Sequence, residues 1–129
     1  MHAELFGIEN CDQCRKARQW LRARGVSVQF HDLRRDGLSV QMLERWLTRV
    51  PWDSLLNRRG QSWRKLEESQ RREVVDRDSL IELLLAQPLL VKRPVLEASD
   101  RLLIGFSEAA YTSAFPEYPE SPAAQAPSA

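Results

Sequence analysis

The first 31 residues place two cysteines at the junction between a strand pattern and a helix pattern. Residues 3–8 form a short apolar run, which is typical of a buried strand. Residues 12–24 repeat apolar positions with helical spacing, and Gly25 stands where helices commonly end. Residues 26–31 alternate between apolar and polar, which predicts a second strand. We therefore expect a right-handed βαβ unit with parallel strands, in which Cys11 and Cys14 lie at the start of the helix.

Cys11 and Cys14 are the only cysteines of the chain, and two residues separate them. The free backbone N–H groups and the dipole at a helix N-terminus stabilise a thiolate. We therefore expect Cys11 at the N-cap to be the nucleophile, and Cys14, one turn further on, to be the resolving thiol. Arg15 lies on the same helix face as Cys11 and would strengthen the effect, whereas Asp12 opposes it.

Two other interpretations of the cysteine pair are open. The pair could be half of a zinc site, but zinc needs about four ligands. The only histidines are His2 and His31, so no metal site is predicted. The two thiols could also be incidental, without a chemical role.

The rest of the chain completes an α/β pattern. We expect a helical insertion over residues 38–88, with one helix capped by Ser39 and another opened by Asp78 or Ser79. Two short strands at 94–96 and 102–104 predict a hairpin, followed by a helix over 107–115. The order β-α-β, helices, β-β-α is that of a thioredoxin-like fold, with a mixed four-stranded sheet. One domain over residues 1–115 is predicted, followed by a disordered tail over residues 116–129, which is rich in Pro, Ala and Ser.

Two groups of polar residues lie where a substrate could bind near the cysteines. In the thioredoxin arrangement, the residue before the third strand is a cis-proline beside the cysteine loop, and Pro94 has that place. Arg93 would then direct its guanidinium toward an anion approaching Cys11; the alternative is a surface arginine beside a strand-starting proline. Asn57, Arg58 and the following arginine form a polar loop that either supplies anion contacts or is simply solvated.

Composition narrows the class of protein. Nineteen basic residues face 18 acidic ones, so the chain lacks the basic excess typical of nucleic-acid binding. No apolar run approaches the length of a membrane span, and the first residues have no signal-peptide pattern. We therefore expect a cytoplasmic protein without direct binding to nucleic acid or membrane, in which a permanent disulfide is disfavoured.

Over residues 3–115 the chain resembles the arsenate-reductase-like (ArsC/Spx) family, and most of all its YffB-type branch. The matching blocks are Leu5-Phe6-Gly7-Ile8 with Cys11 and Lys16-Ala17, Phe30-His31-Asp32, Gly37-Leu38, Leu55-Leu56-Asn57-Arg58, Trp63-Arg64-Lys65-Leu66, Gln87-Pro88, Lys92-Arg93-Pro94 and Gly105-Phe106. The resemblance implies a thioredoxin-like fold and Cys11 as catalytic cysteine. It also implies glutathione or another thiol as reductant, and no bound cofactor.

The resemblance also suggests how members of the family differ. Arsenate reductases of this family hold the oxyanion with three arginines. Arg93 matches one, Asn57 (or Arg58 in a shifted register) stands at the second, and Gly105 stands at the third. Cys14 is instead typical of Spx proteins, redox-switched regulators that bind RNA polymerase. The leading expectation is a glutathione-linked thiol–disulfide oxidoreductase acting on a small thiol or oxyanion substrate. The alternatives are an Spx-like regulator that binds RNA polymerase and a true arsenate reductase.

Overall fold

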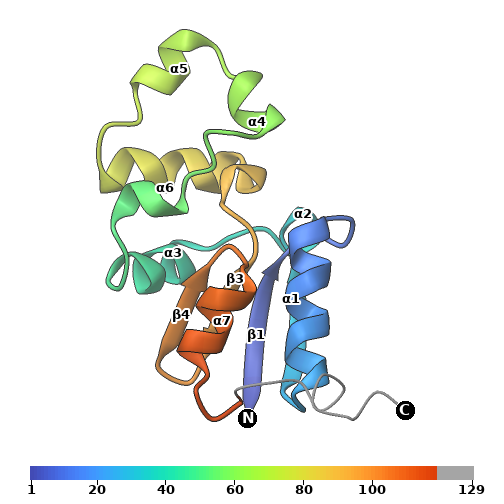
Figure 1. Cartoon of the computed structure of the whole chain (residues 1–129). Coiled ribbons are helices and arrows are strands. Elements are labelled where there is room, and N and C mark those ends of the chain that lie inside the picture. Colours follow the sequence, from blue (N-terminus) through green and yellow to red (C-terminus); the bar gives the residue numbers. More distant parts are fainter. Residues whose placement is uncertain (119–129) are drawn as a thin grey trace. The chain divides into compact units, whose positions relative to one another are not determined.

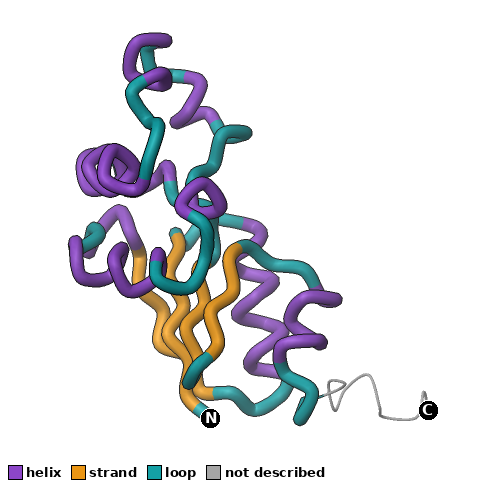
Figure 2. The backbone as a smooth tube through the Cα atoms, turned by 90° about the vertical axis from the view of Figure 1, so that its left-hand side faces the viewer, coloured by secondary structure: helices purple, strands orange, loops and turns teal. Residues whose placement is uncertain are grey.

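A computed structural model describes residues 1–118. Its mixed four-stranded sheet is built from segments before and after the helical insertion. The strand order is β2-β1-β3-β4, and the strands are β1 (His2–Gly7), β2 (Ser27–Asp32), β3 (Val95–Ala98) and β4 (Arg101–Ile104). β3 runs antiparallel to both of its neighbours, with Leu96 opposite Leu5 on β1 and opposite Leu103 on β4. Figure 2 shows the four strands side by side. The sheet predicted from the element order is confirmed.

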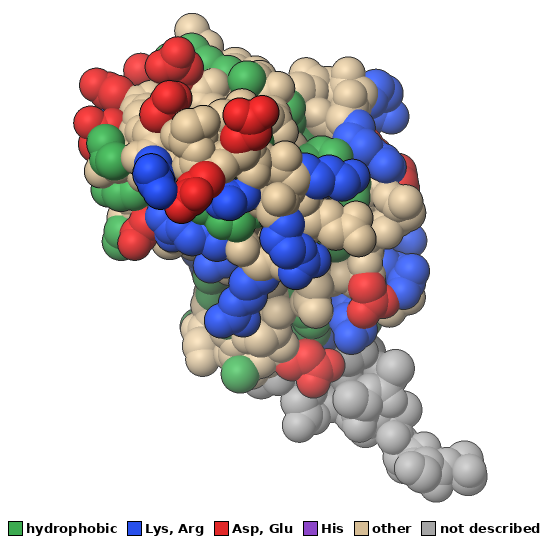
Figure 3. All heavy atoms as spheres, turned by 90° about the horizontal axis from the view of Figure 1, so that it is seen from above, with side chains coloured by type: hydrophobic (Ala, Val, Ile, Leu, Met, Phe, Trp, Pro, Cys, Tyr) green, Lys and Arg blue, Asp and Glu red, His purple; other side chains and the backbone are tan. Residues whose placement is uncertain are grey.

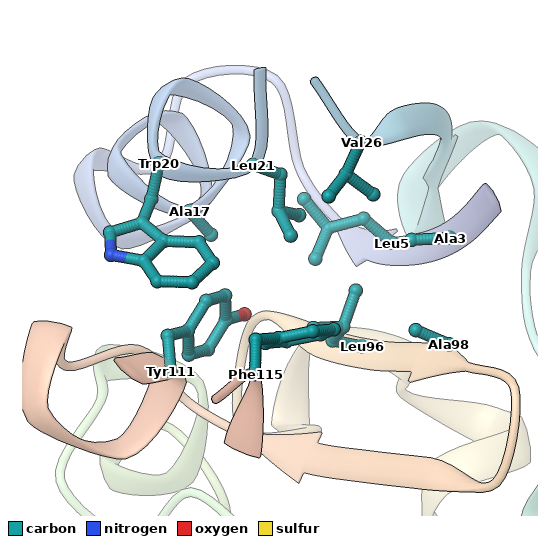
Figure 4. Packing of buried hydrophobic residues seen from close by; sticks show 10 residues of the cluster. All are labelled: Ala3, Leu5, Ala17, Trp20, Leu21, Val26, Leu96, Ala98, Tyr111 and Phe115. Carbon is teal, nitrogen blue, oxygen red and sulfur yellow. The ribbon is translucent and has the colours of Figure 1, made fainter. Parts of the chain in front are cut away.

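Two helices, α1 (Asp12–Ala23) and α7 (Glu108–Ala114), cover the same face of this sheet (Figures 1 and 2). Their apolar sides meet the inward side chains of β1 and β3. Figure 4 shows the resulting core, whose buried members are Ala3, Leu5, Ala17, Trp20, Leu21, Val26, Leu96, Ala98, Tyr111 and Phe115. Trp20 packs edge-on against Tyr111, with ring centroids 5.4 Å apart. Aromatic side chains of α1 and α7 thus hold the two helices over the central strands.

The segment Asp32–Lys92 forms a second compact unit, which is mostly helical. Its elements are α2 (Leu33–Asp36), α3 (Val40–Leu47), the 3-10 helix η1 (Trp52–Leu55), α4 (Gln61–Arg64), α5 (Glu68–Arg72), α6 (Arg77–Ala86) and the 3-10 helix η2 (Pro88–Leu90). α6 packs against α3, η1 and η2. The side chains of Leu43, Trp46, Leu80 and Leu84 are fully buried. The helical insertion is therefore a unit with its own core.

The caps of these helices are partly as predicted. The Ser39 hydroxyl accepts a hydrogen bond from the Met42 N–H at 3.1 Å, which confirms the predicted start of α3. α6 begins earlier than predicted: its N-cap is Asp76, whose carboxylate accepts from the Ser79 N–H at 2.9 Å. Ser79 was thus wrongly predicted to open the helix, because its hydroxyl serves the capping box from inside the first turn.

The boundaries of the units differ from the predicted ones. The helical unit begins six residues before the predicted residue 38, since Asp32 both ends β2 and caps α2 by accepting the Arg34 N–H at 2.8 Å. At the other end, Tyr118 packs against the sheet core, three residues past the predicted domain end at residue 115. The remainder of the predicted tail, residues 119–129, lies outside the described residues.

Candidate active site

Cys11 is the N-cap of α1, at the end of the short loop that follows the inner strand β1. Its backbone is extended (φ −106°, ψ 126°), and its carbonyl accepts the first helical hydrogen bond from the Arg15 N–H at 3.0 Å. The thiol is partly exposed. The loop between β1 and α1 therefore presents the Cys11 sulfur where a partner molecule can reach it, as the sequence predicted.

The surroundings of Cys11 favour the thiolate. Partial burial raises the pKa of the Cys11 thiol. Four groups lower the pKa, and together they outweigh burial: the backbone N–H and the thiol of Cys14, the backbone N–H of Gln13 and the charge of Arg93. The pKa of Cys11 therefore lies below the ordinary value. Among the described residues, the Cys11 side chain makes no N-cap hydrogen bond of normal geometry. The N–H groups therefore act on the sulfur mainly through their partial charges.

Cys14 has the opposite environment, although it lies only one helical turn away. Its side chain is 1% exposed, and burial raises the pKa of its thiol to about 12. The Ile8 backbone N–H and the charge of Arg93 oppose this effect, and the neighbouring Cys11 adds to it. Cys14 is thus a protonated thiol at neutral pH, while Cys11 is the sulfur set up to ionise.

Arg93 and Pro94 precede β3, the strand beside β1. The peptide bond between them is cis, as predicted. Pro94 is buried, and its carbonyl accepts a hydrogen bond from the Gly105 N–H at 2.8 Å, which ties this turn to the end of β4. The half-buried Arg93 is near enough for its charge to lower the pKa of both cysteines. The structure thus brings Arg93, from far along the chain, to the cysteine loop.

Arg15 forms an ion pair within α1. Its guanidinium pairs with the Asp12 carboxylate, and the Lys16 ammonium approaches the same carboxylate at 3.2 Å. The Arg15 guanidinium is therefore paired with Asp12 at the exposed surface of α1.

Asn57 and Arg58 lie in the helical unit, in the loop after η1. The Asn57 N–H donates to the Leu90 carbonyl at 2.8 Å, and Leu56 pairs with Val91 in an isolated bridge, so the loop start is fixed to the chain after η2. The Arg58 guanidinium lies over the Trp63 ring, 5.7 Å from its centroid. The loop is thus anchored at its base, while Arg58 and Arg59 themselves are exposed.

A polar pocket of about 260 Å³ opens on this loop; its lining residues are Asp53, Leu56, Asn57, Arg58, Arg59 and Lys92. Three of them are cationic, which suits an anionic group such as a carboxylate. Lys92 was not predicted as a site residue. The signal available in the sequence was its place beside Arg93, but only the Leu56–Val91 pairing brings it to the loop.

Comparison with known proteins agrees with this arrangement. The model of the ArsC family matches residues 6–114. The chain belongs to the ArsC family. A solved structure named YFFB is 44% identical, with a TM-score of 0.80, and the match covers 87% of this chain and 97% of that one. The solution structure of an arsenate reductase (ArsC) related protein from Brucella melitensis is 48% identical, with a TM-score of 0.69, and the match covers 89% of this chain and 95% of that one.

Among curated relatives of this ArsC-family chain, an uncharacterised protein of Haemophilus influenzae is 38% identical over 111 residues, which are 86% of this chain and 96% of that protein. The global transcriptional regulator Spx of Streptococcus pyogenes serotype M3 is 32% identical over 106 residues, 81% of this chain and 78% of the regulator. The proteins similar to this chain thus include one named as related to an arsenate reductase and one named as a transcriptional regulator.

The surface of the protein carries side chains of both charges (Figure 3). On the face drawn in Figure 3, acidic and basic side chains are both numerous, in keeping with the nearly balanced charge of the chain. Of the helices in residues 1–118, none combines the length and the apolar character that crossing a membrane requires.

Proposed function

We propose that this ArsC-family protein is a thiol–disulfide oxidoreductase with Cys11 as nucleophile and glutathione or a similar small thiol as reductant. The observation that carries the proposal is the contrast between the two sulfurs. Cys11 is accessible, with a lowered pKa, at the N-cap of α1, whereas Cys14 is buried and protonated. A thiolate that water and substrate can reach is the reactive form of cysteine.

The reaction would begin with attack of the Cys11 thiolate on one sulfur of a disulfide. The S–S bond of the substrate breaks, one half leaves as a thiolate, and the other half stays on Cys11 as a mixed disulfide. A second thiol, from Cys14 or from glutathione, then attacks the Cys11 sulfur and releases the bound half. Arg93 would hold an anionic group of the substrate beside the sulfur, because its guanidinium fits carboxylates and oxyanions.

Asn57 and Arg58 are proposed to bind substrate through the polar pocket of the helical unit. Arg58, Arg59 and Lys92 bring three positive charges to it, and the Asn57 amide oxygen is occupied by the Arg59 N–H at 3.0 Å. The group bound there would therefore be an anion, and the arginines would be its principal contacts. Glutathione carries two carboxylates, so it has the required charge.

Activity of single-cysteine variants tests the proposal. With a glutathione mixed disulfide as substrate, the Cys11→Ser variant should lose all turnover, since no other described thiol is exposed. Cys14→Ser should keep the part of the activity that depends on external thiol. Equal activity of the wild type and Cys11→Ser would reject the proposal.

A second candidate is an Spx-like redox-sensing regulator that binds RNA polymerase. It is favoured by the 32% identity to a protein named as a global transcriptional regulator, and by the presence of Cys14. A pull-down with RNA polymerase under oxidising and reducing conditions separates it from the enzyme, because only the regulator should be captured in a redox-dependent way.

Arsenate reduction, a third candidate, is tested by a glutathione-coupled assay with arsenate.

A further inference from the structure

The sulfur of Cys14 occupies space that exists only because residue 7 is glycine. A Cβ placed on Gly7 would overlap with the Cys14 Sγ, closer than non-bonded atoms approach in proteins. The same Cβ would lie 3.4 Å from the Cys14 Cβ and 3.6 Å from the Cε1 of Phe30. Gly7 is not among the glycines with positive φ, so its backbone is one that any residue adopts. Space, and not conformation, therefore explains glycine at this position.

The overlap concerns the one sulfur that has little freedom to move. Cys14 is 1% exposed, and its backbone is part of the first turns of α1. Gly7 itself ends β1, one of the two inner strands of the sheet. A side chain at position 7 could be accommodated only if the Cys14 side chain turned away or if α1 and β1 moved apart.

We propose that Gly7 is the positioning residue of the resolving step: its missing side chain leaves the space that holds the Cys14 sulfur one helical turn from Cys11. The inference rests on the proposed function, because it assigns Cys14 to resolution of the Cys11 adduct. The Cys14 thiol already interacts with the Cys11 sulfur in the reduced protein, where it contributes to the lowered pKa of Cys11. The Cβ atoms of a disulfide lie about 3.5–4.5 Å apart, so the two side chains must turn toward each other to form the bond.

The resolving step exchanges the mixed disulfide for a disulfide within the protein. As the Cys14 sulfur attacks the Cys11 sulfur of the mixed disulfide, the bond between Cys11 and the substrate half breaks. The leaving sulfur keeps the electron pair of that bond and takes up the proton of the Cys14 thiol, which then passes to solvent where the released thiol is acidic. The protein ends as the Cys11–Cys14 disulfide, oxidised by two electrons, and a small thiol such as glutathione reduces it again.

Release of a coloured thiolate from dithiobis-nitrobenzoate measures both steps on the reduced protein. In the wild type we expect a fast release as Cys11 attacks the reagent, then a slower, equal release as Cys14 resolves the adduct. In Gly7→Ala, the second release should slow by about 10- to 100-fold relative to the first, since small misplacements of reacting atoms cost rates of this order. Cys14→Ser should show the first release alone.

Two control variants separate positioning from a general loss of stability. Gly25→Ala introduces strain at a φ of +77°, but its Cβ would meet nothing within 4 Å. It should therefore keep the wild-type ratio of the two rates. Gly7→Ala/Cys14→Ala removes the sulfur that the new methyl group meets. It should unfold at a higher temperature than Gly7→Ala, and it should fold even if Gly7→Ala does not.

The outcomes distinguish this inference from the proposed function. No reaction at Cys11 in the folded wild type would reject the proposed function, whatever the Gly7 variants do. A first release without a second one would overturn the role of Cys14, and with it that of Gly7. An unchanged ratio of rates in folded Gly7→Ala, or a double variant no more stable than Gly7→Ala, would overturn the inference alone.

Discussion

Cys11 and Cys14 are chemically identical side chains whose positions give them opposite properties. At the N-cap, backbone N–H groups and the charge of Arg93 outweigh the effect of partial burial, and the pKa falls. One turn further on, burial dominates and the pKa rises. The N-cap place of Cys11 could be predicted from the end of the strand pattern and the start of the helix pattern. The depth at which Cys14 is buried could not, because it depends on Gly7, which precedes the helix by five residues.

Removal of the Arg93 charge should raise the pKa of Cys11. The cation favours the thiolate, so in Arg93→Ala the thiol should hold its proton to higher pH, and the midpoint of the pH dependence of alkylation should move upward. Arg22→Ala is the matched control, because Arg22 is exposed in the last turn of α1, at the opposite end of the helix from Cys11. Alkylation of Arg22→Ala should follow the wild-type curve. A shift of equal size in both variants would contradict the role given to Arg93.

At the scale of elements, local patterns predicted most helices and strands, and hydrogen-bonding side chains cap the starts of α2, α3, α6 and α7. α1 ends one residue before its predicted end, and β3 and β4 form the predicted hairpin. The predicted start of α6 was wrong. Asp76, Asp78 and Ser79 are all of residue types that cap helices, and the true N-cap is Asp76. The sequence alone could not choose among these three residues. The N-cap is the last residue with a non-helical backbone, and three nearby capping residue types do not show which residue that is.

The start of α3 gives a stability prediction. Ser39→Ala removes the acceptor of the Met42 N–H and should lower the free energy of unfolding by about 1 kcal/mol. Urea denaturation followed by circular dichroism measures the loss. Ser39→Asp, which keeps an acceptor at the N-cap, should retain most of the stability. Equal loss in the two variants would show that the cap hydrogen bond is not the cause.

At the scale of the whole molecule, the sheet core joins the two ends of the described chain. Phe115 is fully buried, and its ring centroid lies 5.7 Å from that of Trp20 on α1. Its ring also lies beneath the Arg101 guanidinium, 4.7 Å from the centroid. The residues that end the described chain are therefore needed by the helix that carries the cysteines.

Truncation of this side chain should destabilise the sheet unit strongly. Phe115→Ala should lower the free energy of unfolding by about 3–5 kcal/mol, the usual cost of the cavity and lost burial. Chemical denaturation measures this loss, and Phe115→Leu, which leaves a smaller cavity, should lose less. A change within error in Phe115→Ala would mean that the last helix contributes little to the core.

The sequence alone determined the order of the elements, the helix that follows Cys11 and the family to which the chain belongs. Each of these depends on neighbours along the chain or on short blocks of residues. Only the tertiary structure decided that Cys14 lies buried against Gly7, that Arg93 acts on both sulfurs, and that Lys92 joins the loop of Arg58. These are contacts between side chains whose directions depend on how strands and helices pack, and periodicity along a sequence does not contain that information.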